Sequence, residues 1–305
     1  MARRRRGLPV NGVLLLDKPK GLSSNHALQR ARRLLQAQKA GHTGTLDPMA
    51  TGLLPLCFGE ATKFSAHLLE ADKAYRTRVE LGMVTDTGDA EGEVIERREV
   101  PRLSEADIEG VLARFRGEIE QVPPMHSALK HQGRKLYELA REGRTIERAA
   151  RRVTVYDARL LALEVDALEL EVRVSKGTYI RTLAEDIGRA LGCGAHISAL
   201  RRLKTGPFAA SDGMLTLEAL EALPDQAARE AALLPLDVLV AHLPRLEVDA
   251  AAAQRLTHGQ PARVTHGLAA GETPRLYRDG AFLGLGTVTT PQEVAPKRLL
   301  SSAVA

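Results

Sequence analysis

Strict alternation of residues in two segments is the feature that most constrains the fold of this chain. In AYRTRVEL, residues 74–81, alternate positions from Tyr75 to Leu81 share one face, and charged residues occupy the other. The segment LLALEVDALELEVRVS, residues 160–175, alternates in the same way on both sides of a turn, as in a β-hairpin. A period of two places one face of each strand against a core. The chain therefore builds its core on a sheet.

Helical segments lie between the predicted strands. NGVLLLDKPKG, residues 11–21, predicts a buried strand and a turn, after which Ser23 or Ser24 can cap a helix. Apolar residues recur at helical spacing in residues 180–191, and Gly192 is expected to end that helix.

The length and the pattern of the C-terminal part predict two domains. A chain of 305 residues can form one large and one small domain. Residues 217–243 are acidic, alanine-rich and helical in pattern, whereas the segment that follows has short strands and glycine turns, including an Arg-Asp-Gly hairpin turn. We expect a basic tail at 1–10, a main domain at 11–243 and a β-rich domain at 244–305.

Positive charge is concentrated rather than spread. The net charge is +5, and Arg3–Arg6 account for four of these charges. The segment 121–152 contains eight Lys or Arg and only three Glu, and its Pro-Pro and glycines suggest an insertion. Such a surplus is a candidate phosphate-binding surface, although a solvated helical face would have the same composition. The basic residues are Lys130, Arg134, Lys135, Arg141, Arg144, Arg148, Arg151 and Arg152.

Cysteine content and hydropathy predict the compartment. Cys57 and Cys193 are the only cysteines, and one possible pair is no disulfide framework in a chain of this length. No apolar run reaches membrane-spanning length, and MARRRRGLPVNG lacks the apolar core of a signal peptide. We therefore expect a cytoplasmic protein without membrane contact.

The block GHTGTLDPMATGLLPLCFG, residues 41–59, sets a single carboxylate, Asp47, before an apolar run. One interpretation makes Asp47 an N-cap with Pro48 at the first helical position. Against this, Gly52 and Pro55 would interrupt a helix within two turns, and LLPLCF is typical of a strand. An aspartate on a turn that leads into a strand can project into a cleft, where catalytic groups are common.

Other kinds of site fit this block poorly. A phosphate-binding loop of the Walker type requires Gly-Lys-Ser or Gly-Lys-Thr at its end, and GHTGTLDP has an aspartate instead. His42 has no cysteine or second histidine at ligand spacing, and His126 and His131 fail the same test. Metal binding is therefore not expected.

Three further residues have both a functional and an ordinary interpretation. Arg181 falls in the first turn of a predicted helix, where the helix dipole disfavours a cation, so either a carboxylate partner or a simple surface position would account for it. Tyr75 and Tyr179 could stack on an unpaired base, but Tyr75 also lies on the apolar side of its strand, as a core tyrosine would.

The motifs taken together closely resemble one enzyme family. GVLLLDKPKGLSS, AGHTGTLDPMATGLLPLCFGEATKF, KAYRTRVELG, TDTGDAEG, QVPPMHSALKHQGRKLYELAREG and SKGTYIRTLAEDIGRALGCGAHISALRRL occur in this order. They resemble the bacterial tRNA pseudouridine-55 synthases of the TruB type over residues 11–208. The tail resembles, less specifically, a PUA-type RNA-binding domain.

The resemblance implies a fold and a reaction. The fold would be α+β, with a catalytic core of pseudouridine synthase type on a mixed, mainly antiparallel sheet. It would carry a thumb-like insertion at 121–152 and a PUA-like domain at 244–305. The enzyme would flip a uridine out of the T-arm loop of tRNA and re-attach its base through C5, without guide RNA, cofactor, metal or protein partner. A monomer is expected. One carboxylate suffices as nucleophile, whereas most glycosidases need two.

The same resemblance assigns roles to individual residues. Asp47 would be the nucleophile, and Arg181 would pair with it. Tyr75 would stack on the flipped uracil, and Tyr179 and Leu200 would line its pocket. The remaining substrate-binding positions implied by the family are His42, which would fill the gap left in the RNA loop, Lys18 and Pro19 under the site, Asp89 beside it, and Arg134, Lys135 and Arg141 in the thumb.

Three alternatives remain open at this level. A relative of the same fold that needs a guide RNA would share most motifs, although the long insertion favours a stand-alone enzyme. An RNA chaperone could retain the scaffold without catalysis, but the set of Asp47, Tyr75 and Arg181 is intact. A glycosidase would need a second acid beside Asp47, and Asp86 or Asp89 could supply it.

Overall fold

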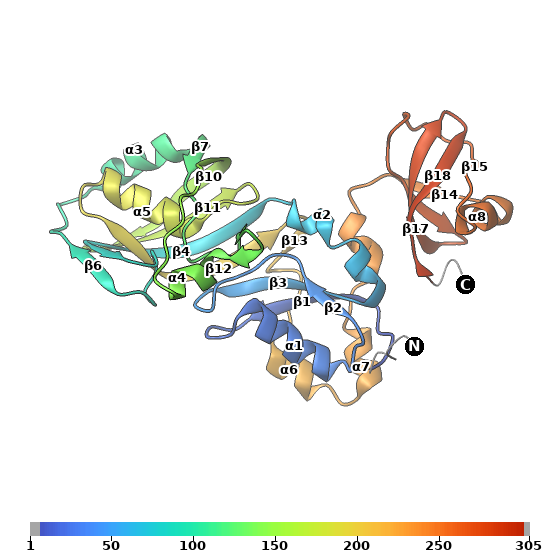
Figure 1. Cartoon of the computed structure of the whole chain (residues 1–305), viewed down its shortest axis with the longest axis horizontal. Helices are drawn as coiled ribbons and strands as arrows, with labels where there is room; N and C mark the ends of the chain where they lie inside the picture. The colour runs from blue at the N-terminus through green and yellow to red at the C-terminus, as the bar shows by residue number, and fades with distance from the viewer. Residues whose placement is uncertain (1–6, 302–305) are drawn as a thin grey trace.

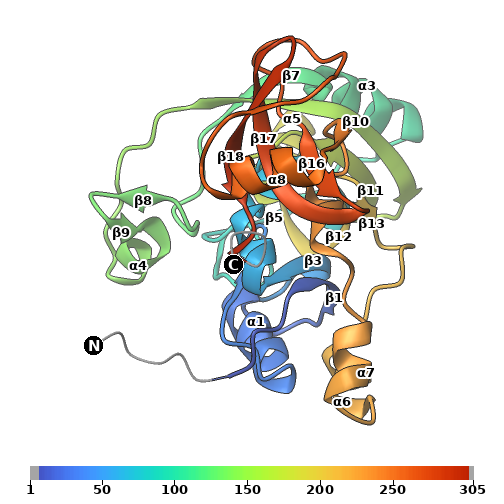
Figure 2. The ribbon, with the colours of Figure 1, turned by 90° about the vertical axis from the view of Figure 1, so that its right-hand side faces the viewer.

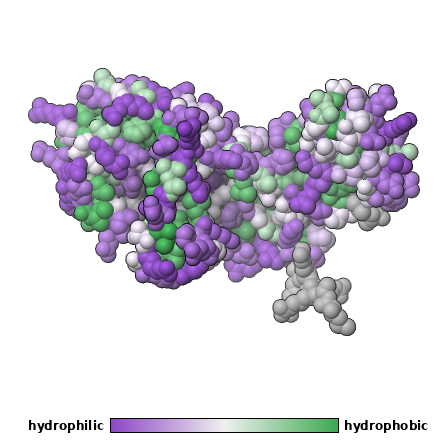
Figure 3. Space-filling model, turned by 45° about the horizontal axis from the view of Figure 1, so that its top comes forward, coloured by the Kyte–Doolittle hydropathy of each residue, from purple (hydrophilic) through white to green (hydrophobic). Residues whose placement is uncertain are grey.

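The structure is a computed structural model that describes residues 7–301. The basic cluster Arg3–Arg6, and with it most of the predicted tail, lies outside these residues. A large lobe built on one long sheet is followed by a smaller β-rich domain (Figure 1). A narrower waist joins the two (Figure 3).

Within residues 7–301 the central sheet has nine strands, and only β3 and β12 form a parallel pair. The predicted mixed, mainly antiparallel sheet is therefore confirmed, as is the hairpin of β10 and β11. In spatial order the strands are β1 (Gly12–Lys18), β3 (Thr51–Phe58), β12 (Ala195–Thr205), β4 (Lys73–Leu81), β11 (Ala167–Val174), β10 (Arg151–Leu163) and β7 (Gly117–Gln121), with β2 (Ala40–His42) beside β3 and β13 (Phe208–Ala209) beside β12.

Both faces of the sheet are covered near β1 and β3. Val13 and Leu15 pack into one hydrophobic cluster, while Leu14 and Leu16 pack into another on the opposite face. A strand buried on both faces needs no polar residues in alternation, which explains the continuous apolar run of β1. The helices on the Leu14 face are α1 (Ser24–Leu34), α3 (Glu105–Phe115), α5 (Ile180–Ala190) and α6 (Leu217–Ala222).

Local signals account for the helix ends. Ser23 caps α1 by accepting a hydrogen bond from the backbone N–H of His26, and Gly192 follows the end of α5 with φ of +84°. The helical pattern predicted at 217–243 is broken into short pieces, since Pro224 and Pro235 interrupt it. The short elements of the large lobe are η1 (Gly59–Lys63), α2 (Ala66–Leu69), β5 (Met83–Thr85), β6 (Val94–Arg97), α7 (Gln226–Ala231) and η2 (Leu236–Val240).

The basic insertion leaves the sheet between β7 and β10. It consists of the hairpin of β8 (Lys130–His131) and β9 (Arg134–Lys135), followed by α4 (Leu136–Arg141). Figure 2 shows it standing out from the lobe as a separate arm. It spans residues 122–150, because β7 and β10 occupy the outer positions of the predicted segment 121–152. We call residues 122–150 the thumb.

The C-terminal part forms a second sheet with its own hydrophobic cluster. The expected hairpin turn is present at Asp279 and Gly280, whose φ angles are both positive, as a type I′ turn requires. The β-rich domain is confirmed, whereas its PUA type stays a prediction. Its strands are β14 (Arg245–Glu247), β16 (Arg275–Arg278), β17 (Ala281–Thr290), β18 (Glu293–Leu299) and β15 (Ala262–Arg263), and α8 (Ala250–Thr257) packs against them.

The two lobes share a hydrophobic cluster at the waist. Phe64 of the large lobe lies 5.5 Å from Phe282 of the small one, measured between ring centroids. The ammonium of Lys63 donates a hydrogen bond to the carbonyl of Leu299, and Tyr277 donates one to Asp237. Across the stretch from residue 7 to residue 301, no helix is long and apolar enough to cross a membrane.

Candidate active site

Asp47 lies on the connection between β2 and β3, and no helix begins there. The N-cap interpretation is therefore wrong, because the chain enters β3 after a single turn in which the N–H of Ala50 donates to the carbonyl of Asp47. Lys18 fixes this turn from below. Its ammonium is fully buried and donates to the carbonyls of Pro19, Pro48 and Ala50 at 2.8, 3.3 and 2.7 Å.

Arg181 holds the carboxylate of Asp47. Its Nη2 lies 3.0 Å from Oδ2 of Asp47, and the side chain of Arg181 is only 4% exposed. The surface interpretation of Arg181 is therefore wrong, and the expected ion pair is present. The same guanidinium lies 3.6 Å from Oδ2 of Asp89 and donates to the carbonyls of Thr87 at 2.9 Å and His126 at 2.6 Å. These contacts explain a cation in the first turn of α5, where the helix dipole opposes it.

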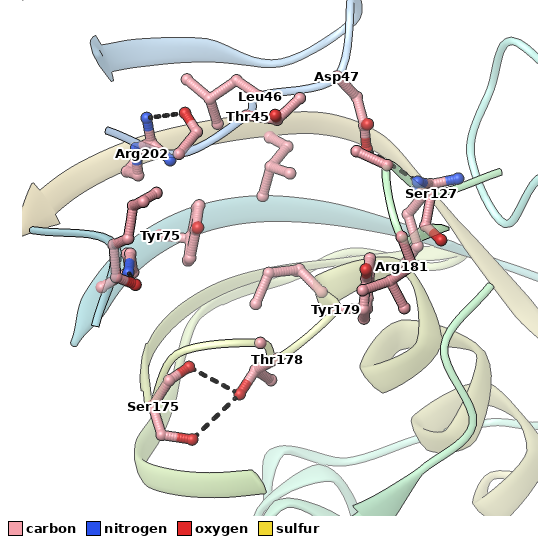
Figure 4. Close-up of a pocket in the computed structure, with 18 residues that line it drawn as sticks. Thr45, Leu46, Asp47, Tyr75, Ser127, Ser175, Thr178, Tyr179, Arg181 and Arg202 are labelled. Atoms are coloured by element: carbon pink, nitrogen blue, oxygen red, sulfur yellow. Dashed lines mark hydrogen bonds and ion pairs between the residues drawn. The ribbon is translucent and has the colours of Figure 1, made fainter. Parts of the chain in front are cut away.

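The environment of Asp47 disfavours the ionised form of its carboxyl group. Burial raises the pKa of the Asp47 carboxyl above its usual range, and the nearby Asp89 adds to this, while Arg181 and Lys18 oppose it. The side chain is 34% exposed and projects toward the cavity beside β4 (Figure 4). The carboxylate is thus held by cations from behind while one side stays open to a ligand.

A cavity of about 320 Å³ opens beside Asp47. Tyr75 on β4 and Leu200 on β12 form one wall, and Tyr179 lies opposite, just before α5. Gln121 fixes Tyr179 by accepting from its N–H at 3.0 Å and donating to its carbonyl at 3.3 Å. Tyr75 is half-buried and borders the cavity, so the simple core interpretation does not hold for it. We call this cavity the aromatic pocket.

A second cavity of about 550 Å³ lies on the other side of Asp47. His42 and Asp89 line it, together with Lys135 and Arg141 of the thumb. His42 therefore lies beside Asp47 but outside the aromatic pocket. Burial lowers the pKa of the His42 imidazole, with the charges of Arg202 and Lys135 adding to the effect.

The thumb residues differ in their orientation. Lys135 and Arg141 flank the ring of Tyr137, with their charged groups 5.3 and 5.5 Å from its centroid, and all three border the second cavity. Arg134 instead forms an ion pair with Glu142 and borders neither cavity. Of the three predicted thumb residues, two therefore line the same cavity as Asp47.

The structure also brings in residues that have no assigned role in the sequence motifs. Lys73, Ser127 and Arg202 line the aromatic pocket, and Gln121 supports it. The signal for Arg202 was present in ISALRRL, since Arg202 shares its strand face with Leu200, where an apolar residue would be expected. Lys73 occupies the same face as Tyr75 in the alternation of β4.

A paired-acid arrangement is not formed around Asp47. Asp89 shares Arg181 with Asp47, but its Oδ1 already accepts from Thr87 at 2.7 Å and from the N–H of Glu91 at 3.0 Å. Asp86 borders neither cavity. Because a glycosidase needs a second carboxyl group free to act on water or a leaving group, the geometry argues against that alternative. From residue 7 to 301 there is no group of three or more potential metal-ligating side chains.

Comparison with known proteins identifies the family. Residues 32–180 match the TruB family pseudouridylate synthase N-terminal domain. Residues 181–241 match the tRNA pseudouridylate synthase B C-terminal domain, and residues 244–300 match the C-terminal domain of pseudouridine synthase II TruB. The chain is 72% identical over 304 residues to tRNA pseudouridine synthase B of Chromohalobacter salexigens, covering 99% of this chain and 98% of the relative. It is 57% identical to the enzyme of that name from Aromatoleum aromaticum, covering 96% and 94%.

Solved structures give the same result for the fold. A chain of a Cbf5–Nop10–Gar1 complex superposes with a TM-score of 0.73 at 28% identity, covering 98% of this chain and 91% of that one. A chain of an H/ACA ribonucleoprotein bound to a substrate RNA superposes with a TM-score of 0.72 at 26% identity, with the same coverage. The predicted pseudouridine synthase core is therefore confirmed. The chain belongs to the TruB family of pseudouridylate synthases.

Proposed function

We propose that this enzyme converts uridine 55 in the T-arm loop of tRNA to pseudouridine, with Asp47 as the nucleophile. The observation that carries the proposal is one partly open carboxylate, held by the buried Arg181 at the mouth of a pocket with aromatic walls. Relatives of high identity that match nearly the whole chain are named tRNA pseudouridine synthase B, which supports tRNA as the substrate.

The chemistry needs one carboxylate and no external reactant. The carboxylate of Asp47 bonds to C1′ as the N1–C1′ bond of the uridine breaks, and the electron pair of the broken bond stays with the uracil. The uracil turns over, C5 bonds to C1′ and displaces the carboxylate of Asp47, the proton on C5 is lost and N1 gains one. Because all heavy atoms of the nucleotide are retained and its oxidation state does not change, no cofactor is involved.

The other residues bind and orient the flipped nucleotide. Tyr75 stacks on the uracil, and Tyr179 and Leu200 bound it on the remaining sides. Arg181 keeps Asp47 oriented and favours its ionised form. In the same proposal His42 occupies the space that the flipped nucleotide leaves in the RNA loop, Lys18 and Pro19 fix the turn below Asp47, and Asp89 fixes Arg181 from behind.

The thumb and the small domain would grip the rest of the RNA. Lys135 and Arg141 border the cavity next to Asp47, where their charges can neutralise phosphates of the T-arm. Arg134 lies further out and would contact the backbone beyond the loop. Residues 11–243 form the catalytic domain in this proposal, and residues 244–305 a PUA-like RNA-binding domain. The enzyme acts as a monomer in the cytoplasm, without guide RNA or protein partner.

Tritium release tests the proposal directly. A T-arm stem-loop transcript labelled with tritium at C5 of its uridines is incubated with the purified protein and with Asp47→Asn. C5 loses its hydrogen only if the base is re-attached through that carbon, so wild type is expected to release one equivalent and Asp47→Asn none. A second transcript carries its single labelled uridine at a neighbouring loop position, and it should give no release if position 55 is the target.

The alternatives give different results in the same assay. A guide-dependent enzyme would bind the stem-loop but release no tritium until a guide RNA and partner proteins were added. If the protein were an RNA chaperone, wild type and Asp47→Asn would bind the stem-loop equally, and neither would release tritium. Release by Asp47→Asn at the wild-type rate would remove Asp47 from the mechanism.

A further inference from the structure

Arg202 is a buried cation without a counter-ion. Its side chain is among the largest that are fully buried, with 1% of the residue exposed. Its Nε donates to the carbonyl of Leu53 at 2.7 Å and its Nη2 to the carbonyl of Gly44 at 3.4 Å. Within residues 7–301 it forms no ion pair, and these two hydrogen bonds, from Nε and Nη2, leave Nη1 as a donor without a partner.

The sheet register places this guanidinium in the aromatic pocket. Arg202 lies directly opposite Tyr75 in the antiparallel pairing of β12 with β4, so the two side chains project from the same face. Both line the pocket. In Figure 4 Arg202 lies at the end away from Asp47 and Arg181, with Tyr75 on the wall. A base stacked on Tyr75 would therefore have Asp47 toward its sugar and Arg202 near its outer edge.

The charge of Arg202 acts on the groups around it. Burial lowers the pKa of Lys73 to about 8, and the neighbouring charge of Arg202 adds to this effect. Arg202 also contributes to the lowered pKa of His42. Lys73 is itself a cation and donates only to backbone carbonyls within residues 7–301, so these two neighbouring positive charges have no carboxylate between them. A buried charge without a partner is costly, and a fold that keeps one leaves it free to bind a ligand of opposite charge.

We infer that Arg202 stabilises the uracil anion that forms while the base is detached from the ribose. This inference rests on the proposed reaction in the aromatic pocket. When the N1–C1′ bond breaks, the electron pair stays on N1, and the resulting negative charge spreads over N1, O2 and O4. Nη1 of Arg202 donates to one of the carbonyl oxygens of the base. The charge disappears when C5 has bonded to C1′, the C5 proton has left and N1 has gained a proton.

The burial of Arg202 favours a base over a phosphate as its ligand. A phosphodiester of the RNA stays at the protein surface, whereas Arg202 is 1% exposed and lines the pocket that would take the base. A donor that faces charge developing in a site without water typically contributes a 10²–10³-fold effect on the chemical step. Arg202 would thus act on the transition state more than on binding of the RNA.

The neighbouring residue provides a matched control. Arg201 projects from the opposite face of β12, where it forms a bidentate ion pair with Asp17 at 3.0 and 2.7 Å. We compare Arg202→Met with Arg201→Met in single-turnover tritium release from the stem-loop, and we measure the affinity of each for a stem-loop with a non-reactive 2′-fluoro-substituted uridine. Arg202→Met is expected to be about 100-fold slower or more, with affinity within a few-fold of wild type. Arg201→Met is expected to keep the wild-type rate.

A change of leaving group separates charge stabilisation from a purely structural role. Fluorine at C5 withdraws electrons and stabilises the detached base as an anion, so less help from Arg202 is needed. We measure the loss of N-linked 5-fluorouridine by nuclease digestion and mass spectrometry, because fluorine at C5 is not released as a proton is. The rate deficit of Arg202→Met should be at least about tenfold smaller with 5-fluorouridine than with uridine. Arg202→Lys, which keeps the charge, should recover part of the uridine rate.

Three results would overturn the inference. An equal deficit with both substrates would make Arg202 a structural support of Gly44 and the Asp47 turn. A loss confined to RNA affinity would make it a phosphate ligand. A wild-type rate in Arg202→Met would leave it no role in the reaction. Release by the wild-type enzyme in the same experiment tests the proposed function separately.

Discussion

Replacing Arg181 by methionine removes the group that connects most parts of the site. Methionine is apolar and unbranched, so it replaces the aliphatic stem of arginine and removes the guanidinium without adding a polar atom. The substitution leaves Asp89, with a side chain 6% exposed, without its cation, and two carbonyls that accepted hydrogen bonds at 2.9 and 2.6 Å lose their donor. Asp47 loses an ion pair of 3.0 Å but remains one-third exposed to water.

These contacts set the expected magnitude. Breaking a buried pair by removing one partner costs about 3–5 kcal/mol, because a charge is left buried without compensation. The exposed part of Asp47 is screened by water and adds little. We therefore expect the free energy of unfolding to fall by about 3–5 kcal/mol in Arg181→Met, as measured by urea denaturation with an unchanged m-value. Adding Asp89→Asn should recover part of this loss, since the uncompensated charge is then gone.

The same variant should shift the pH dependence of any residual activity. Asp47 must be ionised to act, and burial already raises its pKa, so activity is lost as the pH falls through that raised value. Arg181 is the main group that lowers the pKa of Asp47, so its removal should move the acid limb of the rate profile to higher pH. An unfolding free energy within about 1 kcal/mol of wild type, together with an unmoved acid limb, would refute this reasoning.

The remaining predictions concern Asp47, the thumb and one glycine. Asp47→Asn should abolish tritium release and keep RNA affinity within a few-fold. Because the folded-state pKa of Asp47 is raised, ionisation of this group opposes folding above that pKa, so the variant should melt at an equal or higher temperature at neutral pH. A large fall in melting temperature would instead make Asp47 structural. The double variant Lys135→Ala/Arg141→Ala should lower the slope of log affinity against log salt concentration by about 1 for each lost phosphate contact. Arg134→Ala should change the slope less, because the charge of Arg134 is engaged by Glu142. Equal slopes in all variants would exclude a phosphate-binding thumb. Gly52→Ala should unfold the protein or lower its free energy of unfolding by more than about 3 kcal/mol, because φ is +96° and a Cβ would lie 2.4 Å from the carbonyl oxygen of Arg202. The control is Gly21→Ala, where φ is +86° but the space is open and a loss of about 1 kcal/mol is expected. Equal losses of the two variants in a melting experiment would contradict the steric argument.

Local patterns were sufficient for most of the secondary structure. The alternation of residues 74–81, the hairpin in residues 160–175 and the cap at Ser23 are decided by neighbours in the chain, and each is found as expected. The helical pattern at 217–243 was only partly realised, because two prolines end the short helices that it forms.

The sequence by itself also determined the family and the position of Asp47, because the block at residues 41–59 is specific and a turn before a strand is a local property. It left the environment of Asp47 and Arg181 open, because an N-cap and a surface arginine have the same local signals as a catalytic pair. These environments depend on the pairing of β12 between β3 and β4. It brings segments distant in sequence to one pocket, buries Arg181 against Asp47 and turns Arg202 toward Tyr75. Contacts of this kind depend on which strands pair and in which register, and the periodicity of a single strand carries no information about its neighbours.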